Sequence, residues 1–356
     1  MSKVKLLVVL SLAVWLVGCA SPTYYAQALG GQFELWRKSE PIAQLLADSR
    51  TQPQIKSKLQ TMHAIRQFAS EELHLPDNGS YRKYVDLQRP FVVWNVFAAD
   101  EFSVEPSEWC FVVVGCVGYR GYFSKEGAEA FAAELRARGR DVYVGGVPAY
   151  STLGYFDDPV LSTFIRYPDA ELARLVFHEL SHQLVYVGGD STFNESFAVT
   201  VELEGVKRWL DAHGTKADLG NFAVARGRRD DYLALVDTYR HRLQALYASK
   251  VTTAAKRSGK VQLFREMKND YEKLKVTWGG FGGYDWIFSK PLDNAFIAST
   301  SIYTQLVPAF QSLLAKSGGN LDAFYAEVRQ LANSSKAQRD ARLAALMAET
   351  TLVSAR

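Results

Sequence analysis

Residues 169–212 decide the fold and read DAELARLVFHELSHQLVYVGGDSTFNESFAVTVELEGVKRWLDA. Segments 169–187 and 191–212 each have the length and the apolar side chains that one helix needs. The Gly188-Gly189-Asp190 stretch between them predicts a tight turn. Because so short a connection folds the second helix back on the first, we expect a packed pair of helices at the centre of the fold.

The first helix of this pair contains His178-Glu179-Leu180-Ser181-His182, the pattern HExxH. Side chains four positions apart lie on the same side of a helix, so His178 and His182 can both reach one metal ion. Glu179 lies next to that side and can take a proton from a water molecule held there. The alternative is a pair of core histidines satisfied by hydrogen bonds. Apolar neighbours indicate a buried helix, in which a metal is a good partner for polar groups: Leu172, Leu175, Val176, Phe177 and Leu180.

A catalytic zinc site usually has three protein ligands and one open position, so a third ligand is needed. Glu195, early in the second helix, and Glu202, two turns further along the same face, are the candidates. The short turn favours Glu195. Thr192-Phe193-Asn194-Glu195 also fits a capping box, in which the Glu195 side chain would bind the helix backbone instead.

The HExxH pattern, followed by Asn194-Glu195-Ser196-Phe197-Ala198, resembles the gluzincin metallopeptidases. The Asn-Glu-x-Phe-Ala block is similar to that of the large zinc aminopeptidases, although the spacing here is shorter. This resemblance implies one zinc ion held by His178, His182 and Glu195, with Glu179 as the general base. It also implies a small mixed sheet packed on the HExxH helix.

Over nearly its whole length after the first 18 residues, the chain also resembles a bacterial family of predicted aminopeptidases. This resemblance implies zinc-dependent hydrolysis of a peptide substrate, with an aminopeptidase as the first expectation. One part of the similarity lies in the two expected helices, residues 169–187 and 191–212, which we call the metal helices. The other similar blocks are residues 24–28, 93–99, 115–123 and 145–154.

Two other functions stay open. One is a zinc endopeptidase or a hydrolase of cell-wall peptides, because no acidic residue among Asp157, Asp158 and Glu202 stands out as the partner of a free amine. The other is a non-catalytic envelope lipoprotein that binds a partner and uses zinc structurally. Glu179 argues against this second function, because a structural site needs no general base and is closed by four protein ligands.

In gluzincins a strand ahead of the HExxH helix forms the edge of the substrate cleft, and residues 142–152 occupy the matching place. An edge strand binds a peptide through backbone hydrogen bonds. Gly145 and Gly146 would let the peptide approach closely, unless they only bend an ordinary strand. Related enzymes stabilise the oxyanion with Tyr or His, so Tyr303, as a catalytic residue, and Tyr150, beside the substrate, are candidates. For both tyrosines the alternative is simple packing.

The wider pattern predicts an α+β fold that is mostly helical. β-prone segments at 91–97, 119–123 and 141–147 surround a helix from Ser124 to Arg138. We divide the chain into a signal peptide, a tether with an N-terminal helical region, an α/β metallopeptidase core, and a helical C-terminal region: 1–18, 19–90, 91–215 and 216–356. Within the last region a helical hairpin is expected at about 230–275, interrupted by Ser258-Gly259.

The N-terminus has the pattern of an export signal. Lys3 and Lys5 precede an uncharged apolar stretch, residues 6–17, which is too short to span a bilayer as a helix. The following Gly18-Cys19 resembles a bacterial lipobox, which implies that Cys19 is lipidated and anchors the chain to a membrane. Ala20 after the cysteine implies the outer membrane, facing the periplasm.

Export bears on the two other cysteines of the three in the chain. Cys110 and Cys116 are close in sequence and would pair as a disulfide in an oxidising periplasm, the alternative being two buried thiols. The overall composition is ordinary for a globular protein, with 48% hydrophobic and 22% charged residues. A net charge of +3 is too small to indicate a nucleic-acid partner, and the sequence says nothing of the oligomeric state.

Overall fold

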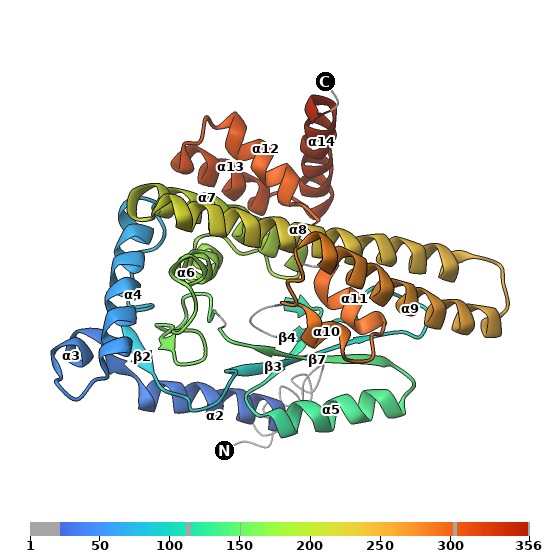
Figure 1. Cartoon of the computed structure of the whole chain (residues 1–356), viewed down its shortest axis with the longest axis horizontal. Helices are drawn as coiled ribbons and strands as arrows, with labels where there is room; N and C mark the ends of the chain where they lie inside the picture. Colours follow the sequence, from blue (N-terminus) through green and yellow to red (C-terminus); the bar gives the residue numbers. More distant parts are fainter. Residues whose placement is uncertain (1–21, 112–114, 150, 302–304, 355–356) are drawn as a thin grey trace, which may run out of the picture.

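The computed structural model describes residues 22–111, 115–149, 151–301 and 305–354 (Figure 1). In these residues the chain is mostly helical and carries three small sheets, so the α+β class is confirmed. None of the helices in this part of the chain combines the length and apolar character that a membrane span requires. Cys19, Tyr150 and Tyr303 lie outside the described residues.

One three-stranded sheet has β3 (Val93–Ala99) at its centre, between β6 (Arg120–Tyr122) and β7 (Asp141–Val147). All three strands are antiparallel, and β7 is an edge strand. Every residue of β3 is buried because α5 (Lys125–Ala137) packs on one face and α11 (Asn294–Ser301) on the other. Ser124 caps α5 as expected, since its hydroxyl accepts a hydrogen bond from the Gly127 N–H.

The expectation of one mixed sheet with an edge strand over 142–152 needs correction. The strand ends at Val147, and its sheet is purely antiparallel. Mixed pairing occurs in a separate small sheet of β1 (Glu40–Pro41), β2 (Lys83–Val85) and β8 (Val160–Leu161). The third sheet is the hairpin of β4 (Trp109–Phe111) and β5 (Gly115–Val117), in which Cys110 and Cys116 face each other and form a disulfide.

The N-terminal helices are α2 (Pro22–Lys38), α3 (Ile42–Ala47) and α4 (Pro53–Glu71). Pro41 is the last residue of β1 and immediately precedes α3. The metal helices are α6 (Asp169–Leu184) and α7 (Ser191–His213), which pack along each other. Beyond α7 lie α12 (Val307–Lys316), α13 (Leu321–Asn333) and α14 (Lys336–Ser354), on the opposite side of the molecule from α2 (Figure 1). The main core surrounds α6 and α7.

The long hairpin consists of α8 (Lys216–Ala248) and α9 (Thr253–Thr277), followed by the short α10 (Asp285–Phe288) (Figure 1). The predicted break at Ser258-Gly259 is wrong, because both residues lie inside α9 and the turn comes before Thr252, which caps α9. Gly259 instead allows α9 to pack closely against α8. A Cβ atom at this position would lie 2.8 Å from the Leu246 side chain of α8.

Candidate metal centre

Helix α6 presents both motif histidines on one side. It begins at Asp169 after Pro168, and Asp169 and Glu171 in its first turn suit the positive end of the helix dipole. Its apolar side is buried in the main core. His178 and His182 lie one turn apart, and their Nε2 atoms are 3.2 Å from each other.

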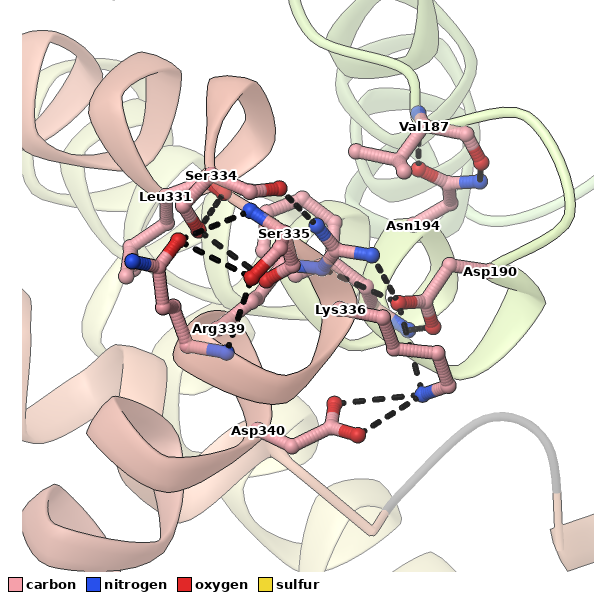
Figure 2. Close-up of polar contacts among 11 residues, drawn as sticks. Val187, Asp190, Asn194, Leu331, Ser334, Ser335, Lys336, Arg339 and Asp340 are labelled. Carbon is pink, nitrogen blue, oxygen red and sulfur yellow. Dashed lines mark hydrogen bonds and ion pairs between the residues drawn. The ribbon is translucent and has the colours of Figure 1, made fainter.

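The turn between the two metal helices is held by side chains from α7 and α14 (Figure 2). The Asn194 side chain accepts a hydrogen bond from the Val187 N–H and donates one to the Val187 carbonyl, both at 2.8 Å. Asp190 caps α7 by accepting from the Phe193 N–H. The same carboxylate binds the buried guanidinium of Arg339 at 2.7 and 3.0 Å. These contacts fix the N-terminal end of α7, and Glu195 lies immediately after its first turn.

A second contact reaches this turn from the disulfide hairpin. Gly115 has a φ of 76°, and a Cβ atom there would lie 2.8 Å from the backbone nitrogen of Gly189. Only glycine allows so close an approach in the left-handed conformation. The hairpin therefore sits directly on the connection between α6 and α7.

Glu195 completes a group of three possible metal ligands. Its carboxylate oxygens lie 3.3 Å from His178 Nε2 and 3.8 Å from His182 Nε2. One ligand atom from each residue can be chosen so that all three lie within 4.8 Å of one another. The capping-box alternative is wrong, because Asp190 is the N-cap of α7 and Thr192 lies within the helix.

Glu202 lies behind His178 and outside this group. Its Oε2 atom is 2.8 Å from His178 Nδ1 and 3.0 Å from the Arg174 guanidinium. The side chain is only 1% exposed. A carboxylate on Nδ1 leaves Nε2 of the same ring as the atom offered to a metal. Glu202 is thus placed to orient a candidate ligand and is not part of the candidate ligand group.

The electrostatics of the site favour a cation at this position. Burial alone would lower the pKa of His178, but its bonds to Glu195 and Glu202 raise that pKa to about 10. Burial lowers the pKa of His182 to about 4, so this ring is neutral at pH 7. The two carboxylates therefore hold a positive charge on His178, and a cation bound between the ligands would take the place of that charge.

The donor set fits zinc. Two imidazoles and one carboxylate are zinc ligands found in catalytic sites, where they leave one position open. In the described part of the chain, the buried Glu195 Oε2 atom makes no full hydrogen bond and has only the 3.3 Å ion-pair contact with His178 Nε2. A buried carboxylate oxygen that is so incompletely satisfied is a suitable ligand for a cation.

Glu179 follows His178 on α6 and lines the same cavity as the ligands. Burial raises the pKa of its carboxyl to about 7, against an ordinary value of 4.5, while the charge on His178 opposes the shift. A carboxylate with a pKa near neutrality is suited to accept and return a proton at physiological pH.

A cavity of about 440 Å³ contains the candidate ligands and Glu179. Its walls come from α2, the disulfide hairpin, β6, the end of β7 and the segment that follows. They are mostly apolar and aromatic, and they include Tyr24, Phe111, Tyr119, Phe123, Val147 and Leu153.

A family model described as "Putative aminopeptidase" matches residues 23–343. The chain belongs to this family. The match extends from α2 into α14 and includes every residue of the candidate metal centre and its cavity. Comparisons with curated proteins and with solved structures give no match.

For a chain of this aminopeptidase family, two of the three predicted substrate residues, Gly145 and Gly146, need revision. Neither Gly145 nor Gly146 lines the cavity. The Phe91 ring packs against Gly146 in the space that a side chain would occupy. A Cβ atom at this position would lie 2.2 Å from the ring. Packing explains this glycine, so the geometry does not support a role in peptide binding.

Two tyrosines that sequence reasoning missed do line the cavity. Burial and the charge of Glu195 raise the pKa of Tyr119, on the turn before β6, and that of Tyr186, just after α6. Both hydroxyls therefore stay protonated at neutral pH. In the sequence, these two tyrosines are distinguished only by their nearness to β6 and to the HExxH motif. Because the chain has 18 tyrosines, that nearness is not a specific signal.

Proposed function

We propose that the chain is a zinc-dependent peptidase that uses Glu179 as its general base. The observation that carries this proposal is the convergence of His178, His182 and Glu195 beside Glu179 in one cavity. The family name independently indicates peptidase activity. A structural zinc site would need a fourth protein ligand and would have no use for Glu179.

When bound, zinc supplies a Lewis acid that polarises the scissile carbonyl and acidifies water. The residues of the chain perform the remaining steps. The Glu179 carboxylate accepts a proton from the attacking water and returns it to the leaving amine, so the proton count balances. Tyr119 stands in the cavity as a protonated donor and can stabilise the oxyanion that forms on the carbonyl.

The variant Glu179→Gln tests this function. Loss of a general base costs roughly 10²–10⁴-fold in rate, whereas zinc bound by the other three residues should stay near one ion per chain. Hydrolysis of a peptide panel and metal content by mass spectrometry are the two readouts. Glu134→Gln, at an exposed position of α5, is the matched control. Full activity in Glu179→Gln would refute Glu179 as the general base, whereas a wild type that binds zinc and cleaves no peptide would favour the partner-binding lipoprotein.

A specific observation favours a second candidate, the zinc endopeptidase. Among the described residues that line the cavity, the only carboxylates are Glu179 and Glu195, and the undescribed residues include no Asp or Glu. Of the three acidic residues considered for a free amine, Glu202 is bound to His178 and Arg174. Asp158 is engaged by Thr152, and the exposed Asp157 lies outside the cavity wall.

Paired substrates separate the two candidates. An aminopeptidase requires the free amine, so acetylation of a short peptide should abolish its cleavage. An endopeptidase should cleave the acetylated peptide as well as the free one, because no carboxylate in this cavity is left to recognise the amine.

We also propose that the protein is held in the cell envelope by lipidation of Cys19, at the outer membrane and facing the periplasm. The support is the N-terminal sequence pattern alone. Mass spectrometry of the N-terminal peptide tests it, since an acylated Cys19 should be the first residue. An N-terminus at any other residue would contradict the anchor.

A further inference from the structure

Helix α2 has apolar side chains on two opposite faces. The inner face packs on the protein: Leu35 is buried, and Gly31 lets the helix approach the Phe123 ring. The Gln27 side chain fixes this orientation by accepting from the Phe123 N–H and donating to the Gly121 carbonyl. A helix that is apolar on both faces needs apolar surroundings on both.

The outer face of α2 is exposed. Leu29, Phe33 and Trp36 follow one another at helical spacing and are 69%, 58% and 69% exposed. Tyr25 continues the same stripe toward the start of the helix. Isolated exposed apolar residues are ordinary on a protein surface, but a continuous stripe marks an interaction site.

A loop far away in sequence extends this stripe. Tyr155 and Phe156 are 69% and 56% exposed, and they line one groove of about 540 Å³ together with Leu29, Phe33 and Trp36. Two charged residues line the groove, Lys83 and Asp157, and a further basic residue, Arg37, is exposed at the adjoining end of α2. Aromatic and leucine side chains bordered by basic groups are the composition of surfaces that lie in the lipid headgroup region.

We propose that the outer face of α2, with Tyr155 and Phe156, rests on the bilayer to which Cys19 is attached. This inference rests on the proposed lipidation of Cys19. Three residue steps separate Cys19 from the start of α2 at Pro22, which reach at most about 11 Å. The anchor therefore holds α2 beside the bilayer, and the exposed stripe lets the helix lie flat on it.

Anchoring favours lipid over a second copy of the chain as the occupant. A covalent anchor next to α2 makes contact with the bilayer an intramolecular event with a high effective concentration. On its other side, α2 lines the metal cavity with Tyr24 and Ala28. One helix would thus separate the membrane from the active site.

Quenching of tryptophan fluorescence by brominated acyl chains tests this surface. The full lipidated protein is reconstituted in vesicles of phosphatidylethanolamine and phosphatidylglycerol, with and without bromine. Trp286 of α10 is 56% exposed and is absent from the groove, so Trp286→Phe is the matched control for Trp36→Phe. We expect quenching in the wild type and in Trp286→Phe, and its loss in Trp36→Phe.

Quenching that survives in Trp36→Phe, or that is absent from all three proteins, would overturn the proposal. If the protein does not float with the vesicles, it has no lipid anchor, and the proposal that rests on this anchor fails. A dimer in detergent that dissociates in Phe33→Gln would assign the surface to a second copy instead. Peptide hydrolysis in detergent is measured on the same samples, so that a failure of the proposed peptidase activity is seen separately.

Discussion

Glu202 Oε2 lies 2.8 Å from His178 Nδ1, on the side of the imidazole ring that faces away from Glu195. The same carboxylate accepts a hydrogen bond from Arg174, 3.0 Å away. Burial would raise the pKa of Glu202, but Arg174 and His178 lower it to about 2, so it stays ionised at every physiological pH. A permanently charged carboxylate behind a metal-binding histidine fixes the ring and increases its basicity.

Replacement of this residue should weaken metal binding without destroying the site. We expect Glu202→Gln to reduce zinc affinity by about 10–100-fold, the usual effect of losing such an orienting partner. Glu195→Ala should remove stoichiometric zinc altogether. Competition with a fluorescent chelator measures both. Glu204→Gln, on the same helix but paired with Arg208, is the control. Equal loss in Glu202→Gln and Glu204→Gln would refute the orienting role.

Removal of the metal should destabilise the fold around α6 and α7. A ligand that binds only the native state at about 100 times its Kd contributes about 2.7 kcal/mol to the free energy of unfolding. We therefore expect a chelator to lower the Tm, and added zinc to restore it. In Glu195→Ala the chelator should have no effect. A Tm that is insensitive to chelation in the wild type would contradict the site.

Local pattern was sufficient for the central part of the site. Helix spacing alone puts His178 and His182 on one side of α6, and the short turn after them brings Glu195 close. These features depend on neighbours in sequence. This is also why the sequence predicted the N-cap of α5 and the first and last residues of both α5 and β7 to within about one position.

Other features of the fold and of the cavity depend on contacts between residues far apart in sequence, and no local pattern reveals these contacts. Gly259 looked like a helix breaker, but contact with Leu246 of another helix explains it. Gly146 was expected to let a peptide substrate approach, but the Phe91 ring packs against it. Tyr119 becomes a cavity residue only because the turn before β6 is brought to the metal helices. Likewise, the buried pair of Asp190 and Arg339 joins positions 149 residues apart in the chain.

That pair gives a direct test of how the C-terminal helices support the metal centre (Figure 2). Arg339 and Asp190 are only 4% and 8% exposed. Removal of one partner from a buried ion pair costs about 3–5 kcal/mol, because the other charge stays buried. We expect Arg339→Ala to lose about that much in denaturant unfolding and to bind zinc less tightly. Arg342→Ala, at an exposed position of α14, should change stability by less than about 0.5 kcal/mol.

The pH dependence of stability provides the last prediction, at Asp158. Burial raises the pKa of this carboxyl to about 6, although Thr152, Ser151 and Gln183 donate hydrogen bonds that oppose the shift. The ordinary value is 3.8, so between about pH 4 and pH 6 the native state holds a proton that the unfolded state has lost. The stabilisation from that proton is complete below this window and is lost as the pH rises through it.

The variant Asp158→Asn removes this titration. The free energy of unfolding of the wild type, relative to the variant, should therefore fall by at most about 3 kcal/mol from pH 4 to pH 6. Denaturant titrations at half-unit intervals of pH measure the difference. Asp157→Asn, at the exposed neighbouring position, controls for the chemical change. A difference between the wild type and Asp158→Asn that stays constant, or that rises with pH, would show that Asp158 is ionised throughout in the folded protein.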